Sequence, residues 1–433
     1  MSSLVSANTT TTTIAAAIRG RLQSKDTFAD IREKALLHFE KLGLPGNRSE
    51  EYKHTPLARL LEKHFDFSLQ NPEPGNISPE AYTVAGIEGS VLVFVNGKFN
   101  SELSRIDDIK GVTVKPLAEA PAVIAKKLGT IAEPASDPFV AWNTAAWEEG
   151  IYIHVERNVV VEKPVFIYHV HDTREGQVVS AGRNFIVCEA GSEITVFDTL
   201  YTTGTNNSFS TLVSEGIVEE NAGLNWYSIQ NDSQARFHFD HRQINQARSS
   251  RVNTFTFTLN GKAVRNNLQL SLDGEGIDSH MYGLYLLGGD TLADNHTVVD
   301  HRQPNSFSNE MYKGVIDDKA RGVFNGKIYV RPNAQKTNAF QSNRNILLSD
   351  QATVNTKPQL EIWADDVKCS HGCTTGQLDE EALFYLRARG IHEHTARAMM
   401  LYAFAAELLE PMKHEGIRNY IDSLISERLH KDF

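Results

Sequence analysis

Cysteine, long apolar runs and excess basic charge are all missing or scarce in this sequence. Only three cysteines occur in 433 residues, too few for a disulfide framework in a chain of this length, which favours a reducing compartment. The longest apolar runs, 91–95 and 399–406, are far shorter than the roughly 18–20 residues of a membrane-spanning helix. The N-terminus has no basic segment before an apolar stretch, so no secretory signal is indicated. We therefore expect a soluble, cytoplasmic protein without a membrane partner.

The charge balance and the missing nucleotide motifs exclude further classes. With 43 Lys and Arg against 54 Asp and Glu, the formal net charge is −11, so no broad basic surface is available for a nucleic acid. The Gly-Lys dipeptides at 97–98, 261–262 and 326–327 lack the glycine and the Ser/Thr of a P-loop. Neither a GxGxxG nor a GxSxG motif is present. We expect a chain that does not itself hydrolyse ATP or bind a dinucleotide.

The N-terminal part of the chain divides into a tail and a helical region. Residues 1–26 include five consecutive threonines, 9–13, without an amphipathic period, so we expect a disordered tail. Apolar residues then recur at spacings of three and four from Phe28 to Leu42, which predicts a helix that ends at Gly43. A second helix is expected at 57–65, so residues 27–80 are predicted to form an N-terminal helical region.

From 81 to 373 the pattern is that of a large all-β unit. Short runs of β-branched and aromatic residues recur every 8–12 residues between Gly, Asn and Asp turns, without helical crossovers. A sandwich, a barrel or a β-solenoid is compatible with this pattern. Many short strands with few strong hairpin turns favour stacked coils, although no fixed-period repeat is visible.

Helical periodicity returns at the C-terminus, and residues 374–433 are predicted to form a helical subdomain. Asp379 is positioned to cap a helix that ends before Gly390, and a second helix runs to Pro411. These helices are apolar over more than one stripe. The additional apolar surface is explained either by packing within the subdomain or by docking of a partner.

The densest group of reactive side chains lies at the junction of the β unit and the C-terminal helices. In an extended strand, Cys369, His371 and Cys373 project to one face, with neighbours roughly 6.6 Å apart. Thiolate and imidazole bind iron, zinc or copper, but three ligands close neither a structural zinc site nor a four-thiolate iron–sulfur site. The residues alone leave two interpretations open: metal or sulfur handling, and a buried thiol beside a hydrogen-bonded histidine.

Other polar and thiol groups favour structural roles. Cys188 follows Phe185-Ile186-Val187 and is expected to be a core thiol. The His- and Asp-rich segment 294–304 can imitate a metal or acid–base site, but we expect its side chains to satisfy turns and coil edges.

The sequence around Cys369 resembles the C-terminal hallmark of the SufB/SufD family, and Lys368-Cys369-Ser370-His371-Gly372 points to its SufD branch. The resemblance covers most of the chain from about Phe28 onward. Further matching segments are Asp300-His301-x-x-Pro304, Ser308-Asn309-Glu310-x-x-Lys313-Gly314, 322–327, Gln341-Ser342-Asn343-x-Asn345, 358–362, Gly43-Leu44-Pro45 and 50–57.

The family implies a right-handed parallel β-helix flanked by helical N- and C-terminal regions. It implies assembly with a SufB-like subunit and a SufC-like ABC ATPase into a complex that builds iron–sulfur clusters. By the resemblance, Cys369 and His371 lie near the SufB interface, and Cys373 departs from the family pattern as a further candidate metal ligand. The C-terminal helices would dock the ATPase, and the residues expected to contact it are Phe384, Tyr385, Arg387, Arg389, Gly390, Leu401 and Phe404.

The resemblance thus predicts a non-catalytic scaffold subunit that helps iron acquisition and cluster formation at the SufB interface. Alone it would hold no tightly bound cofactor, only transient iron or a cluster shared with SufB. A homodimer is one of the states open to the isolated chain, and the sequence does not decide its oligomeric state. Two alternatives remain: a β-helix polysaccharide lyase or hydrolase, and a purely structural assembly subunit.

Overall fold

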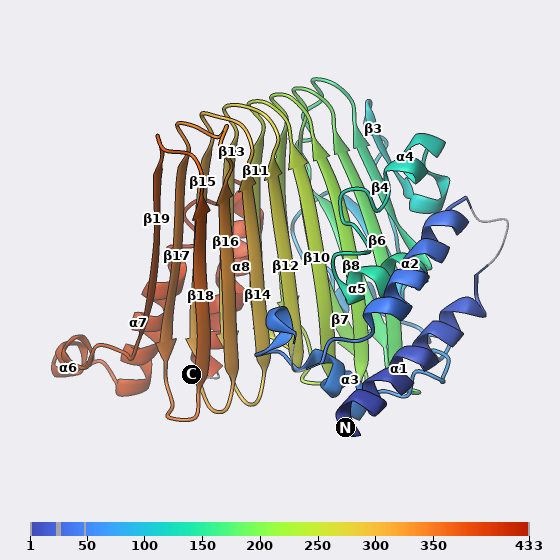
Figure 1. Cartoon of the computed structure of the whole chain (residues 1–433). Helices are drawn as coiled ribbons and strands as arrows, with labels where there is room; N and C mark the ends of the chain where they lie inside the picture. Colours follow the sequence, from blue (N-terminus) through green and yellow to red (C-terminus); the bar gives the residue numbers. More distant parts are fainter. Residues whose placement is uncertain (1, 23–26, 47–48, 432–433) are drawn as a thin grey trace.

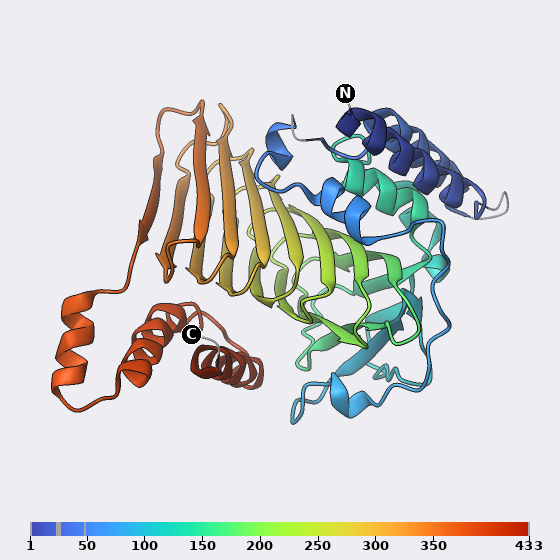
Figure 2. The same cartoon turned by 90° about the horizontal axis from the view of Figure 1, so that it is seen from below.

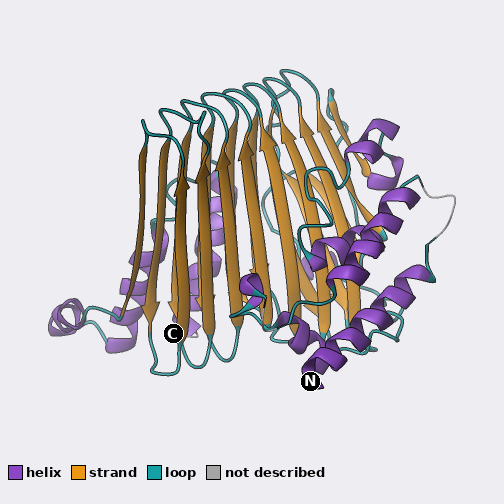
Figure 3. Ribbon diagram, viewed as in Figure 1, coloured by secondary structure: helices purple, strands orange, loops and turns teal. Residues whose placement is uncertain are grey.

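The computed structural model describes residues 2–22, 27–46 and 49–431. Its body is a parallel β-solenoid built from two long sheets (Figures 1 and 3). The ten-stranded sheet contains, in spatial order, β19 (Lys368–Gly376), β17 (Asn338–Leu347), β15 (Phe307–Ile316), β13 (Asp278–Leu287), β11 (Arg251–Asn260), β9 (Gly223–Asn231), β7 (Glu193–Thr203), β5 (Val165–Asp172), β1 (Ser90–Val95) and β2 (Lys98–Phe99). The nine-stranded sheet contains β18 (Thr353–Ile362), β16 (Arg321–Val330), β14 (Leu292–His301), β12 (Ala263–Leu272), β10 (Arg236–Gln246), β8 (Ser208–Val218), β6 (Val178–Cys188), β4 (Glu149–Val155) and β3 (Val112–Pro116).

Successive strands alternate between the two sheets. From β4 onward each turn adds one strand to each of the two sheets, which gives about eight turns between Glu149 and Gly376. The expected parallel β-helix with flanking helices is confirmed. Coil length varies along the solenoid: Arg251 pairs with Asp278 and Phe307 pairs with Asn338, so the second of these two coils is the longer one. This variation explains why the sequence shows no fixed-period repeat.

Alternate residues of each strand face the interior between the sheets. Leu268, Leu270 and Leu272 of β12 illustrate this period of two, and all three belong to the continuous inner core. At the corners the chain turns sharply through residues with left-handed backbone angles, such as Asn221 (φ 58°) and Asn305 (φ 63°). Asparagine tolerates that conformation better than most residues, which explains the Asn-rich turns between strands.

The N-terminal helices cover the outer face of the nine-stranded sheet at the first turns (Figures 1 and 2). Aromatic residues of the sheet, among them Phe209, Phe237 and Phe239, pack against them. The elements are α1 (Ser2–Arg19), α2 (Ala29–Leu42), η1 (Glu50–Tyr52), α3 (Leu57–His64), η2 (Pro79–Ala81), η3 (Leu117–Glu119), α4 (Ala122–Lys127) and α5 (Pro138–Ala146). The helices expected at 27–43 and 57–65 are thus present as α2 and α3.

Two expectations for this half of the chain are corrected. The segment predicted to be disordered, 1–26, contains α1, because Ile14, Ala15 and Ile18 belong to the apolar cluster in which α1 packs on α2 and α3, and this packing outweighs the low helix propensity of the threonines. Residues 1 and 23–26 lie outside the described part. The range 81–373 is not strand throughout, since α4 and α5 interrupt it. Helix α5 is buried on every side between Phe139 and Ala145 and so lacks a readable amphipathic period.

The C-terminal helices lie against the outer face of the ten-stranded sheet. They are α6 (Glu380–Ala388), α7 (Glu393–Ala406) and α8 (Glu415–Lys431), and α6 projects away from the body (Figure 2). The predicted cap is present, because the Asp379 carboxylate accepts hydrogen bonds from the backbone N–H groups of Glu381 and Ala382. Among the described helices, none is both long enough and apolar enough to cross a membrane.

Candidate functional site

The C-terminal end of the solenoid is where the candidate ligands lie. Strand β19 is the last strand of the ten-stranded sheet and pairs with β17, and β18 is the last strand of the other sheet. Both strands stand at the left end of the solenoid in Figure 1. The interior between the sheets therefore opens to the surface beside two strand edges, each with backbone groups available for pairing.

Cys369, His371 and Cys373 form a row on the inner face of β19, which we call the inner row. They pair in register with Ala339, Gln341 and Asn343 of β17, all of them buried residues of the solenoid interior. In-register residues of parallel strands share a face, so the inner row lines the open end of the interior. The extended conformation and the common face agree with the sequence-based expectation.

The two thiols of the inner row differ in environment. Cys369 is half-buried against the inner core, and burial raises the pKa of its thiol above the ordinary value. Cys373 is exposed, and its Sγ lies 2.6 Å from Thr356 Oγ1 of β18. His371 is exposed between them. Cys188 is buried in the core as expected, and burial raises the pKa of its thiol to about 12.

The inner row by itself is not a closed metal site. It supplies three side chains at most, and nowhere in the described part of the chain are three or more His, Cys, Asp or Glu placed to hold a metal ion. The row can offer single thiolate or imidazole ligands to a metal that other groups also bind.

Polar residues that sequence analysis did not assign to the site lie directly behind the inner row. Gln341, Asn343 and Asn345 face inward from β17, and Glu310 and Tyr312 face inward from β15. Asn343 Nδ2 donates to Tyr285 Oη at 3.0 Å, and Tyr285 Oη donates to Asn345 Oδ1 at 2.5 Å. The alternating Gln-x-Asn-x-Asn pattern is a sequence signal for an inward polar face.

Two glycines make room for this polar layer. A Cβ at Gly314 would lie 2.1 Å from the Tyr285 ring, and a Cβ at Gly326 would lie 2.2 Å from Gln341 Nε2. Real Cβ atoms do not approach other atoms so closely, so both positions require glycine. Three of the segments that carry the family resemblance, 308–314, 322–327 and 341–345, therefore contribute to the interior next to the inner row.

The His- and Asp-rich segment has the structural role that we expected. On the outer face of β14, His296 contacts Glu51 at 3.2 Å and Asp294 at 3.0 Å, and Thr55 donates to Asp294. The hydrogen bond from His296 lowers the pKa of Glu51 to about 2. Burial acts to raise the pKa of Asp294, but the charges of His296 and Arg265 outweigh it and hold that pKa at about 2. These contacts fasten the segment that follows η1 to the solenoid.

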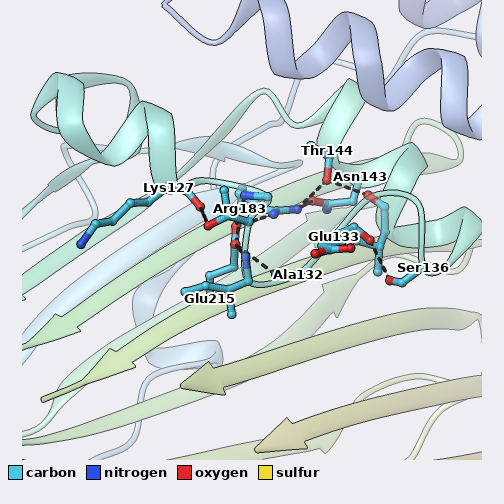
Figure 4. A network of polar contacts seen from close by, with 12 residues as sticks. Lys127, Ala132, Glu133, Ser136, Asn143, Thr144, Arg183 and Glu215 are labelled. Atoms are coloured by element: carbon cyan, nitrogen blue, oxygen red, sulfur yellow. Dashed lines mark hydrogen bonds and ion pairs between the residues drawn. The ribbon is translucent and has the colours of Figure 1, made fainter. Parts of the chain in front are cut away.

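A buried ion pair at the other end of the molecule is also structural (Figure 4). Arg183 donates to Glu215 Oε1 at 2.5 Å, and neither side chain is exposed. Glu215 also accepts from the backbone N–H groups of Gly129, Ile131 and Ala132. These contacts hold the loop before α5 against β6 and β8.

The residues expected to contact an ATPase fall into two groups. Phe384 and Tyr385 of α6 are 71% and 57% exposed, and Arg387 and Arg389 lie at the end of the same helix, which Gly390 terminates with φ 87°. The expectation for Leu401 is wrong. This residue of α7 is buried against the ten-stranded sheet, because the apolar stripe to which it belongs covers the solenoid. Phe404 is partly buried, with Lys313 Nζ 4.6 Å from its ring centre.

Comparisons with known proteins agree with this architecture. A model of the SufBD core domain of the SUF system for iron–sulfur cluster assembly matches residues 169–404, and a model of the SufBD N-terminal region matches 16–167. The iron–sulfur cluster assembly protein SufD of Escherichia coli is 30% identical over 401 residues, 92% of either chain. A SufBD family protein of Synechocystis is 30% identical over 400 residues, 89% of this chain and 88% of the relative, and SufD of Bacillus subtilis is 27% identical over 305 residues, 67% of this chain and 66% of the relative.

These matches favour the cluster-assembly interpretation over a polysaccharide lyase or hydrolase. Both family models together extend over the N-terminal helices, the solenoid and part of the C-terminal helices, with the inner row inside the core model. The core model alone matches more than half of the chain. The protein therefore belongs to the SufBD family of the SUF iron–sulfur cluster assembly system.

Proposed function

We propose that this chain is the SufD-like scaffold subunit of a SufBCD-type complex, without catalytic activity of its own. The observation that carries the proposal is the inner row, which presents two thiols and one imidazole at an open solenoid end beside two unpaired strand edges. Such an end suits a second β-solenoid, because strand edges pair with strand edges. The open end is thus the proposed interface with a SufB-like subunit.

The ligand inventory determines what this interface does. Cys369 and His371, with Cys373 as a third candidate, offer sulfur and nitrogen to iron, but they cannot enclose it. The SufB-like subunit would supply the remaining ligands, so the iron or cluster is a shared and transient cargo and the chain alone holds no tightly bound cofactor. A thiol that binds iron releases a proton, and His371, the next residue along the row, can accept it only while its own imidazole is not bound to iron.

The projecting helix α6 is the proposed docking site for a SufC-like ABC ATPase. Phe384 and Tyr385 expose large apolar area and Arg387 and Arg389 add charge, which is the combination typical of protein interfaces. Helix α7 links this site to the solenoid, because the buried Lys313 of β15 donates to Phe404 O and to Glu407. Movement of the docked ATPase would reach the sheet through this contact.

Complementation tests the proposal against a purely structural role, in a cytoplasm that depends on the SUF pathway. Cells that express the double variant Cys369→Ala/His371→Ala are expected to lose the activity of iron–sulfur enzymes, while the variant still co-purifies with its partners. Ser370→Ala is the matched control, since Ser370 lies between them but on the opposite face of β19. Normal enzyme activity with the double variant would favour the purely structural subunit.

A further inference from the structure

Glu310, Gln341 and His371 form one column across the last three strands of the ten-stranded sheet. Glu310 of β15 is the register partner of Gln341 of β17, and Gln341 is the register partner of His371 of β19. Neighbouring strands lie about 4.8 Å apart, so in-register side chains on one face are within contact reach. Glu310 and Gln341 are 1% and 3% exposed, whereas His371 stands at the open end.

Glu310 decides which end of the Gln341 amide faces it. A carboxylate only accepts hydrogen bonds, and Gln341 Nε2 donates to Glu310 Oε2 at 2.7 Å. The amide oxygen is therefore turned away from Glu310, and this buried Gln341 Oε1 has no hydrogen-bond donor within the described part of the chain. Leaving such a buried oxygen unpaired is unfavourable, so a donor supplied to it is stabilising.

Gly326 of β16 holds the same amide from the opposite sheet. Its missing side chain leaves the space that Gln341 Nε2 occupies, 2.2 Å from where a Cβ would lie. The amide nitrogen thus lies between Glu310 and Gly326. Its free oxygen stays next in register to the imidazole.

We propose that the exposed side chain of His371 rotates so that one ring N–H donates to Gln341 Oε1, which fixes the tautomer that leaves the other ring nitrogen free to bind iron. Gln341 and Glu310 are then positioning residues: Gln341 acts on the ligand and Glu310 orients Gln341. Metal-binding histidines almost always donate their second ring N–H to such an acceptor. The role toward iron rests on the proposed function, whereas the fixed tautomer is a property of this chain alone.

Nitrogen NMR of the full-length, metal-free chain with ¹⁵N-labelled histidine tests the inference at a pH well above 7, where the Glu310 carboxyl is ionised and histidine is ordinarily neutral. The His371 signals are those that disappear in His371→Ala. The wild type is expected to show one pure tautomer, and Gln341→Leu the averaged signals of two. Glu310→Gln should also give a mixture, because an amide at 310 lets the Gln341 amide turn over.

Two further variants separate positioning from general damage. The exchange Glu310→Gln/Gln341→Glu keeps the buried groups but restores an acceptor beside His371, so it should return the signals to one tautomer. Gln230→Leu is the matched control, since Gln230 is a buried glutamine of β9, several turns away. It should leave the His371 signals unchanged.

Equal tautomer populations in the wild type and in a folded Gln341→Leu variant would overturn the inference. Its failure is distinguishable from failure of the proposed function. If the wild type shows one tautomer but His371→Ala still supports cluster assembly, the hydrogen bond stands and the iron-binding role of His371 is lost. If the wild type shows one tautomer and His371 is needed for cluster assembly, Gln341→Leu should lower iron binding by the assembled complex about 10-fold or more.

Discussion

Thr356 of β18 and Cys373 of β19 join the two sheets across the open end of the solenoid, with 2.6 Å between Thr356 Oγ1 and Cys373 Sγ. Because successive strands alternate between the sheets, this contact connects the last strand of one sheet to the last strand of the other. It places an exposed thiol at the rim and leaves Cys369 half-buried deeper in the same row.

The three thiols should therefore react with an alkylating reagent in a fixed order. Cys373 is expected to react first and Cys369 more slowly, because burial shields Cys369 and raises the pKa of its thiol. Cys188 should react only after unfolding, since it is buried and its pKa is raised to about 12. Mass spectrometry of the alkylated native protein gives the order, and modification of Cys188 in the folded chain would contradict the described core.

Glu310 should make stability depend on pH. Burial raises the pKa of this carboxyl to about 7, so between its ordinary value and 7 the folded chain retains a proton that the unfolded chain releases. Its contribution to stability is present below the unfolded pKa and is lost as the pH rises through 7. Between pH 5 and pH 8.5 the free energy of unfolding of the wild type should therefore fall by on the order of 1–3 kcal/mol more than that of Glu310→Gln, so the variant gains this much relative to the wild type. Denaturant titrations at the two pH values measure this gain, and parallel pH profiles would contradict the burial of an ionisable Glu310.

The Arg183–Glu215 pair should be costly to break from one side. Glu215→Gln leaves the buried guanidinium without its counter-charge and is expected to destabilise the fold by about 3–5 kcal/mol. The exposed pair Lys163–Glu88 is the control, and Glu88→Gln should change stability far less, because solvent screens this pair. Thermal unfolding measures both variants. A small effect at Glu215 would mean that the loop before α5 is not held by this pair.

Alanine variants of Phe384 and Leu401 should separate an effect on ATPase binding from an effect on folding stability. Phe384→Ala removes an exposed ring and is expected to leave the melting temperature unchanged while weakening binding to a SufC-like ATPase about 10-fold or more. Leu401→Ala opens a cavity in the cluster between α7 and the sheet and should cost about 2–5 kcal/mol of stability. Affinity measurements with the purified ATPase and melting curves distinguish the two. Unchanged affinity of Phe384→Ala would move the docking site away from α6.

The sequence predicts those features that depend on a short local pattern. Cys369, His371 and Cys373 alternate along one strand, so their common face follows from a period of two. Helices α2 and α7 follow from apolar spacing in the same way. In α1 the threonines conceal the pattern, and its helical state depends on packing against α2 and α3. Propensity is a weak local signal that such contacts override.

The column behind the inner row could not be predicted, because it depends on register between coils of unequal length. The coil from Gln341 to His371 is one residue shorter than the coil from Glu310 to Gln341. A register error of one residue would turn a side chain to the other face of the sheet. Only the folded solenoid shows that these three residues are neighbours. The same limit applies to Thr356 and Cys373, which lie in different sheets.

Anaerobic reconstitution of the complete complex tests the central claim most directly. The chain is assembled with its SufB-like and ATPase partners, supplied with iron and sulfide, and iron and sulfide are then measured in the purified complex. The wild type and Ser370→Ala should retain a cluster, and Cys369→Ala/His371→Ala should lose most of the iron while the subunits stay together. An undiminished iron and sulfide content in the double variant, or a stable cluster bound by this chain alone, would contradict a shared site at the open end of the solenoid.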